Sequence, residues 1–214
     1  MRRFEGAMRS RERSAKRSEA INFSDLDPRV AEETVNRMLD HFDDPDNYID
    51  KGGAAKVYEV AHGICAKKLE SRHDSEHAHL MNLGNDIATE SRYLERLAFF
   101  HVSGVRSPRY LGHIQARDKS FSVILMERLD AVNLQHVLSG TEQMPKSMNI
   151  DVFLQALSDY INELNTKAGI VHGDLEARNV MIDRATGLPR IIDFGRAQTV
   201  KTMPKEKQKA LIDK

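Results

Sequence analysis

The spacing of apolar residues predicts three helices. Residues 28–42 carry an apolar position at about every fourth residue and follow Asp27-Pro28, a capping aspartate with a proline in the first turn. Residues 74–101 are also expected to be helical. A third helix is predicted over 150–167 and ends before Gly169. Its apolar positions are Val152, Leu154, Leu157, Ile161 and Leu164.

Short apolar runs between turn residues predict strands. Residues 48–68 have the pattern of a hairpin around Gly52-Gly53, with a turn near His62-Gly63. Residues 105–128 predict two or three strands with a turn at 117–119, and the run 121–125 is apolar enough for a buried strand. Two further strands, at 180–182 and 191–192, bracket a turn at Thr186-Gly187. No internal repeat is present.

Composition narrows the class of protein. Hydrophobic residues make up 40% and charged residues 30% of the 214 residues, as in globular domains. The 32 basic and 32 acidic residues balance, which argues against a globally basic nucleic-acid binder. One cysteine, Cys65, excludes a disulfide framework and fits a reducing compartment. No apolar run approaches the ~20 residues of a membrane helix, and no Sec-type apolar core is evident.

The neutral total conceals two basic ends. Residues 1–20 hold seven basic and three acidic residues, a net +4, and residues 201–214 hold five and two, a net +3. The 180 residues between them therefore carry −7. The Arg- and Ser-rich segment 1–23 is expected to be a disordered, solvated arm, although an arm that binds an acidic partner would have the same composition.

The clearest chemistry lies in Val171-His172-Gly173-Asp174-Leu175-Glu176-Ala177-Arg178-Asn179, followed by Asp193-Phe194-Gly195. Asp174, Asn179 and Asp193 would bring two carboxylates and an amide oxygen to one place. A magnesium–nucleotide site uses few carboxylates, an amide oxygen, and room for water and phosphate oxygens. In such a site Asp174 would stay free to orient an attacking hydroxyl.

These segments resemble the protein-kinase superfamily. The first matches the catalytic loop H-R-D-L-x-x-x-N except that Gly173 replaces the arginine, and D-F-G is intact. Cys65-Ala66-Lys67 is similar to the end of the lysine-bearing strand, Glu90 occupies the place of the helix-C glutamate, and 125–129 resembles a gatekeeper and hinge. The resemblance covers 49–195. It implies an α+β, bilobal protein-kinase-like fold with a β-rich N-lobe and a short, truncated helical C-lobe.

The resemblance implies a role for each matching catalytic residue. Asp174 would accept the proton of the substrate hydroxyl, and Lys67, paired with Glu90, would hold the α- and β-phosphates of ATP. Asn179 and Asp193 would bind Mg²⁺.

The nucleotide base is assigned in the same way. Adenine would lie between Val57 and Cys65 on one side and Met181 on the other. Met126 would be the gatekeeper, and the backbone of Glu127 and Leu129 would bind the base. The glycine-rich loop, at Gly52-Gly53, is the weakest match, because it keeps only the middle glycine of the motif, with Asp50 in place of the first and Ala55 in place of the third. Small residues still let a backbone approach phosphates, but a simple hairpin turn explains the segment equally well.

The sequence departs from the pattern of ordinary protein kinases in two ways that bear on the acceptor of the phosphate. Nineteen residues, 196–214, follow D-F-G, so we expect no A-P-E motif, no peptide-docking helical subdomain and no need for activation-loop phosphorylation; Gly173 fits the absence of such a loop. Glu176 stands where serine/threonine kinases place a lysine, and Arg178 resembles the arrangement of tyrosine kinases. Arg178 would either neutralise the transferred phosphate or simply pair with Glu176. We expect a Ser/Thr rather than a Tyr acceptor.

The short C-lobe, the H-G-D-L loop and the basic arm together resemble minimal type III secretion effector kinases of bacterial pathogens. This resemblance implies a soluble monomer secreted into the host cytoplasm, with a host signalling, ubiquitin-pathway or chaperone protein as its substrate. No specific nucleic acid and no membrane are expected as partners. The expected organisation is a basic arm at 1–23, a helix at 24–47 packed on the N-lobe, the N-lobe at 48–129 and a minimal C-lobe at 130–214.

Two alternatives remain open. Small-molecule phosphotransferases of the aminoglycoside or choline kinase type also favour H-G-D, but they need a large helical lobe to enclose their substrates. A binding module that uses the kinase fold to occupy a partner surface would keep the fold with catalysis secondary.

Overall fold

A computed structural model describes residues 48–51, 55–61, 63–70, 87–115 and 121–206. The arm at 1–23, the predicted helix at 28–42, and Gly52 and Gly53 lie outside these residues. Within these ranges, no helix combines the length and the apolar character that crossing a membrane requires.

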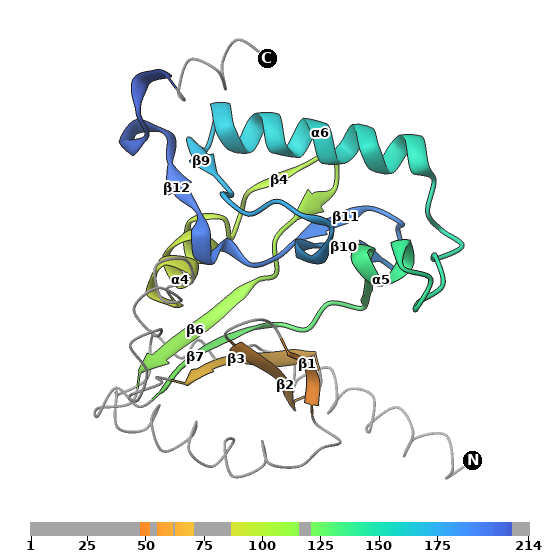
Figure 1. The fold of residues 1–214 in the computed structure, drawn as a ribbon, viewed down its shortest axis with the longest axis horizontal. Coiled ribbons are helices and arrows are strands. Elements are labelled where there is room, and N and C mark those ends of the chain that lie inside the picture. Colours follow the sequence, from red (N-terminus) through yellow and green to blue (C-terminus); the bar gives the residue numbers. More distant parts are fainter. Residues whose placement is uncertain (1–47, 52–54, 62, 71–86, 116–120, 207–214) are drawn as a thin grey trace, which may run out of the picture.

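A five-stranded antiparallel sheet forms the first lobe (Figure 1). Its strands are β1 (Tyr48–Lys51), β2 (Ala55–Ala61), β3 (Ile64–Glu70), β6 (Tyr110–Gln115) and β7 (Phe121–Glu127), in the order β1-β2-β3-β7-β6. The predicted hairpin at 48–68 is therefore extended to three strands, and Gly63 turns β2 into β3 at φ +75°. The buried strand predicted at 121–125 is confirmed, since Val123, Ile124 and Leu125 are buried on β7.

One helix, α4 (Ile87–Arg96), packs against this sheet and against the segment that carries D-F-G. The helix predicted over 74–101 is wrong at its C-terminal end, because α4 ends at Arg96. The chain then turns, and β4 (His101–Val102) pairs with β5 (Val105–Arg106) across a tight turn. The last residue that was predicted to be helical, His101, therefore belongs to strand β4. Residues 71–86 lie outside the description.

A second sheet begins the other lobe, in the order β4-β5-β11-β10-β8. Its strands β8 (Ala131–Asn133), β10 (Val180–Asp183) and β11 (Pro189–Ile191) come from beyond the hinge, whereas β4 and β5 precede it. β10 and β11 are antiparallel around the predicted turn at Thr186-Gly187, which is confirmed. A small pair joins β9 (Ile170–Val171) to β12 (Gln198–Thr199).

The long helix α6 (Ile150–Thr166) covers the second sheet on the side away from the first (Figure 1). The short helix α5 (Leu134–Leu138) precedes it. Asn149 caps α6 by accepting a hydrogen bond from the Val152 N–H, and the chain leaves its end through Gly169 at φ +64°, as predicted.

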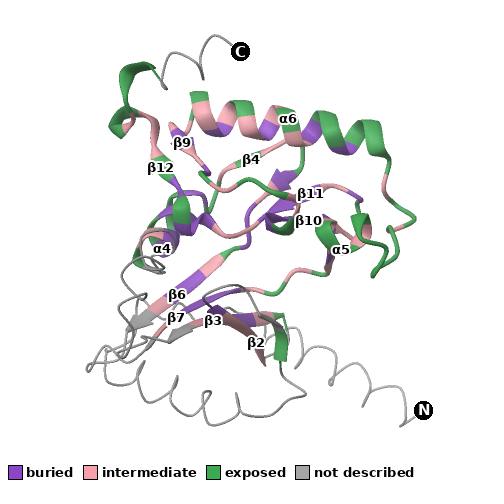
Figure 2. Ribbon diagram, in the orientation of Figure 1, coloured by how far each residue is buried: buried purple, intermediate pink, exposed green. Residues whose placement is uncertain are grey.

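The apolar face predicted for this helix is partly wrong. The buried positions are Phe153, Ala156, Tyr160 and Leu164, whose spacing follows one face of a helix (Figure 2). Val152 and Leu154 are 54% and 56% exposed. Phe153 and Tyr160 bury larger side chains than the predicted stripe offered, and the Tyr160 hydroxyl is satisfied by Ser107 Oγ at 3.1 Å. Of the predicted stripe, only Leu164 is fully buried.

Candidate active site

Three charged side chains meet where the first sheet, α4 and the D-F-G turn converge. Lys67 lies on the central strand β3, between β2 and β7, and its Nζ is 2.6 Å from Glu90 Oε2 on α4. The same nitrogen is 3.0 Å from Asp193 Oδ1. Burial opposes the charge on Lys67, but Glu90 and Asp193 outweigh it and raise the pKa of Lys67. The ammonium is therefore held charged inside the protein, as a phosphate ligand must be.

Asp193 reaches this position through an unusual backbone. It adopts a left-handed conformation, at φ 63°, and caps the 3-10 helix η4 (Phe194–Arg196) by accepting from the Gly195 N–H. Burial favours the neutral carboxyl, but the nearby Lys67 ammonium holds the pKa of Asp193 below its ordinary value. A strained aspartate kept ionised in a partly enclosed position is suited to binding a cation.

Asp174 and Asn179 are joined by the fold of the loop between β9 and β10. Asn179, in the 3-10 helix η3 (Ala177–Asn179), donates from Nδ2 to the Asp174 carbonyl at 2.7 Å and to Asp174 Oδ2 at 3.2 Å. Because the nitrogen serves both contacts, the amide oxygen is turned away from Asp174 and is the group left for a cation.

His172 holds the backbone of this loop through hydrogen bonds of its ring nitrogens. The Asp174 N–H can only donate, so His172 Nδ1 accepts from it at 3.3 Å, and Nε2 carries the proton that it donates to the Ile192 carbonyl at 2.9 Å. Burial lowers the pKa of His172. The neutral ring also packs on Phe194, with centroids 4.6 Å apart. His172 thus links the loop of Asp174 to that of Asp193.

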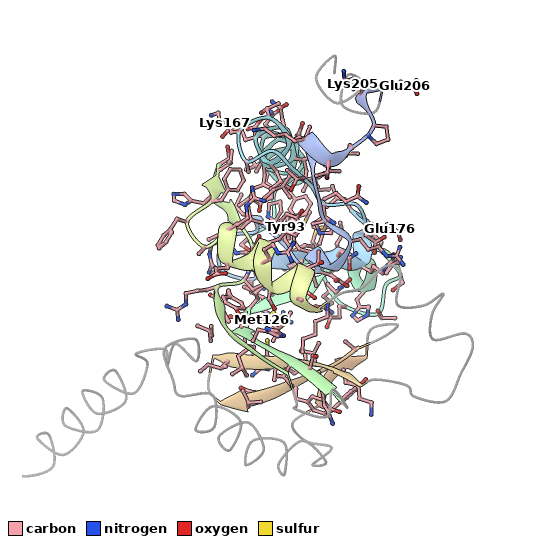
Figure 3. The ribbon with its side chains drawn as sticks, turned by 90° about the vertical axis from the view of Figure 1, so that its left-hand side faces the viewer. Tyr93, Met126, Lys167, Glu176, Lys205 and Glu206 are labelled. Carbon is pink, nitrogen blue, oxygen red and sulfur yellow. The ribbon has the colours of Figure 1, made fainter. Side chains whose placement is uncertain are left out.

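Two arginines surround the carboxylate of Asp174. Arg178 Nη2 lies 3.0 Å and 3.1 Å from its two oxygens, and Arg178 also pairs with Glu176. Of the two roles that the sequence left open for Arg178, the pair with Glu176 is present, and neutralisation of a transferred phosphate stays a prediction. The hydrogen bond to Asp174 is the main cause that raises the pKa of Arg178. Arg196 Nη1 approaches Asp174 Oδ1 at 3.5 Å. Glu176 lies at the outer edge of the molecule in Figure 3.

The local backbone explains why position 173 is a glycine. It sits at φ +79°, and a Cβ added there would lie 2.2 Å from the Arg196 carbonyl oxygen. The backbone after D-F-G thus presses directly against the residue before Asp174, and only glycine fits.

The residues predicted to line the base lie on both lobes. Cys65 pairs with Met126 across β3 and β7, and Val57 pairs with Lys67 across β2 and β3. Met126 is buried on β7 and lies at a lower level than α4 in Figure 3. Burial raises the pKa of the Cys65 thiol to about 12, and its Sγ is 3.6 Å from the Glu127 carbonyl.

The remaining residues predicted to bind the base lie on other segments. Met181 is half-buried on β10 of the second sheet, and Leu129 follows β7 in the hinge. The predicted loop glycines, Gly52 and Gly53, fall outside the described residues.

Two arginines of the site were not predicted from the sequence. Arg106, on β5, donates from Nη2 to Glu127 Oε1 at 2.7 Å and so anchors the hinge to the second lobe. Burial opposes ionisation of Glu127, but Arg106 and the Arg109 N–H hold its pKa below the ordinary value. Arg196 could have been suspected from its place directly after D-F-G, whereas Arg106 is 21 residues from Glu127 and belongs to no motif.

A family comparison assigns the chain. The model of the protein kinase domain matches residues 46–212. The chain belongs to the protein kinase domain family. The family match supports kinase-type phosphotransfer, and the family implies ATP as the phosphate donor with, usually, a divalent metal. A search of curated proteins found no match.

Solved structures similar to this kinase domain agree on the fold. One is a structure described as the bifunctional kinase-methyltransferase WbdD, with a TM-score of 0.53 and 20% identity, covering 74% of this chain and 33% of that one. A second WbdD crystal structure has a TM-score of 0.54 and 18% identity, with 77% and 35% covered. A monomeric WbdD structure has a TM-score of 0.51 and 20% identity, with 75% and 36% covered. The kinase domain described here thus spans about a third of the length of these chains.

Proposed function

We propose that this kinase domain transfers the γ-phosphate of ATP to a serine or threonine hydroxyl of a protein, acting as a bacterial effector on a host protein. The observation that carries the proposal is the set of polar contacts that assembles the site. Lys67 bridges Glu90 and Asp193, and Asn179 binds Asp174. A charged lysine buried at this junction is the group that a nucleotide phosphate requires, which supports phosphotransfer over a scaffold role.

The donor set suits ATP and Mg²⁺. Lys67 is a charged, buried donor for phosphate oxygens, and the Asp193 carboxylate and Asn179 amide oxygen are hard ligands of the type that Mg²⁺ prefers. When bound, Mg²⁺ would neutralise charge on the phosphate oxygens. Adenine would lie against Val57, Cys65 and Met181, with Met126 as gatekeeper and the backbone of Glu127 and Leu129 as its partners.

The transfer step then needs mainly positioning. The acceptor hydroxyl gives its proton to the Asp174 carboxylate as its oxygen bonds to the γ-phosphorus, and the bond from that phosphorus to the leaving ADP oxygen breaks. Asn179 holds Asp174 in place, and Arg178 offers positive charge beside it. No covalent protein intermediate is required.

Two features bear on the acceptor and on an effector role. The glycine of H-G-D is explained by the contact with the Arg196 carbonyl, so it does not point to a small-molecule acceptor. The basic, Ser-rich arm resembles that of secreted effector kinases. We therefore propose a monomer delivered by a type III system into the host cytoplasm, with a signalling, ubiquitin-pathway or chaperone protein as substrate and with no nucleic-acid or membrane partner.

Labelling of a host-cell lysate tests the proposal. Wild-type protein, Asp174→Ala and Asp193→Ala would be incubated with lysate, Mg²⁺ and γ-labelled ATP, followed by mapping of the phosphorylated residues. Asp151→Ala is the matched control, because Asp151 is exposed and lies on α6, on the side of the second sheet away from the site. We expect labelled serine or threonine in host proteins with the wild type and the control only.

The other outcomes separate the alternatives. Labelled small molecules would instead identify a small-molecule phosphotransferase. A captured partner without any label would identify a binding module. Equal labelling by wild type, Asp174→Ala and Asp193→Ala would overturn the assignment of the site.

A further inference from the structure

The carboxylate of Asp174 is crowded by donors. Oδ1 faces Arg178 Nη2 at 3.0 Å and Arg196 Nη1 at 3.5 Å. Oδ2 faces Arg178 Nη2 at 3.1 Å and Asn179 Nδ2 at 3.2 Å. A carboxylate offers about four lone-pair positions. An acceptor hydroxyl that must donate to Asp174 therefore needs one of these groups to move away.

Of these donors, Arg196 can move away from Asp174 with the smallest loss of stability. Its contact is the longest of the set and is an ion pair rather than a well-formed hydrogen bond. Its side chain is 53% exposed, and exposed ion pairs contribute little stability. Asn179, by contrast, is buried and also holds the Asp174 carbonyl. Arg178 is tied to Glu176 as well as to both oxygens of Asp174.

A displaced guanidinium needs a new partner. An anionic group on the acceptor, close to the reacting hydroxyl, would supply one, and a guanidinium binds a carboxylate or a phosphate through paired hydrogen bonds. The backbone of Arg196 is fixed meanwhile, because its carbonyl lies against Gly173. The side chain can therefore swing from Asp174 to the acceptor about a fixed point.

We propose that Arg196 is a specificity-determining residue that selects acceptors carrying a carboxylate or phosphate beside the phosphorylated hydroxyl. This inference rests on the proposed function, since it concerns the acceptor of that same reaction. The incoming anion takes Arg196 from Asp174, which frees an oxygen of Asp174 for the hydroxyl. Binding of the acceptor is thereby coupled to the freeing of the Asp174 carboxylate that takes the proton of its hydroxyl.

The test compares peptides with one central serine in a neutral background, flanked by alanine, by glutamate or by phosphoserine. Initial rates would be measured with wild type, Arg196→Gln and Arg196→Lys. Arg184→Gln is the matched control, because Arg184 is 51% exposed and makes a single ion pair of 3.5 Å with Asp130, away from the site. The glutamate and phosphoserine peptides distinguish the two sources of negative charge.

We expect the wild type to favour at least one acidic peptide over the neutral one by about tenfold in kcat/KM, as one charged hydrogen bond would supply. The preference should fall to near unity in Arg196→Gln through a higher KM for the acidic peptide. Arg196→Lys should restore part of it, which a purely structural role would not do. Arg184→Gln should keep the wild-type preference.

A binding measurement makes the result independent of transfer. Fluorescence anisotropy of labelled peptides, with wild type or Arg196→Gln and a non-hydrolysable ATP analogue, should show tighter binding of the acidic peptides that needs Arg196. Equal binding and equal rates across peptides and variants would overturn the inference but leave the proposed function intact. Failure of the lysate labelling would overturn the proposed function, and anisotropy would still decide the role of Arg196.

Discussion

A Cβ placed on Gly173 would lie 2.2 Å from the carbonyl oxygen of Arg196. This contact joins the residue before Asp174 to the residue after D-F-G, so the two loops of the active site touch through their backbones. The sequence suggested that Gly173 stands in for an arginine that a phosphorylated activation loop would need. The structure supplies a local cause: at φ +79° and against a carbonyl, no side chain fits.

Replacement of Gly173 by alanine should therefore destabilise the protein strongly. The left-handed backbone alone costs about 1–2 kcal/mol for an L-residue, and displacing the Arg196 carbonyl should bring the total to about 3 kcal/mol or more. Urea denaturation would measure the loss. Gly140→Ala is the control, because Gly140 has φ +76° with nothing within 4 Å of the added Cβ, so only the backbone cost should appear. Equal losses in the two variants would contradict the close-contact argument.

The buried pair of Lys67 and Glu90 leads to a second prediction. Lys67→Met should cost about 3–5 kcal/mol of stability, because it leaves the Glu90 carboxylate buried without its cation. Binding of MgATP, measured by calorimetry, should be lost as well. Thermal denaturation of the variant with and without nucleotide would show both effects.

A double variant separates stability from function. Lys67→Met combined with Glu90→Leu removes both charges, so most of the stability should return while nucleotide binding stays absent. Asp193 would remain and would keep part of the destabilisation, since it also contacts Lys67. Recovery of nucleotide binding in the double variant would contradict the role proposed for Lys67.

The motif residues could be predicted because their spacing is fixed by local structure. Asp174 and Asn179 lie on one short loop that carries a recognisable motif, and Lys67 is assigned by the resemblance of its strand to the lysine-bearing strand of protein kinases. The buried face of α6 could not be assigned correctly, because Val152 and Phe153 are both apolar and only packing on the second sheet chooses between them. The role of Arg106 could not be predicted for the same reason, because its contact with Glu127 depends on how distant strands pair.

The neutral state of His172 gives a prediction on pH. Its folded-state pKa is lowered by burial, so the proton that the unfolded chain takes up near its ordinary pKa of about 6.5 is excluded from the folded protein. The contribution of His172 is therefore fully present above about pH 6.5 and is lost as pH falls toward its folded value. The carboxylate of Asp193, also with a lowered pKa, should lose its contribution only near and below about pH 4.

Urea denaturation at several pH values between about 5 and 7.5 would test this, since the two windows are separate. The stability of the wild type should fall with decreasing pH, and His172→Asn should be less stable but flatter. His136→Asn, at an exposed position on α5, should follow the wild type. A slope that survives in His172→Asn would mean that other groups titrate in this range.

Cys65 offers a direct probe of the nucleotide site. It is the only cysteine of the chain, so alkylation at any site other than Cys65 can be recognised with a Cys65→Ser control. With a pKa of about 12, its thiolate fraction at pH 8 should be about a thousandfold below that of a free thiol, and iodoacetamide should react correspondingly slowly.

Because Cys65 pairs with Met126 beside the hinge, MgATP should slow the reaction further. Mass spectrometry over time would follow both rates. Equal rates with and without MgATP would remove Cys65 from the adenine site, whereas fast alkylation in both would mean that the thiol is not buried as described.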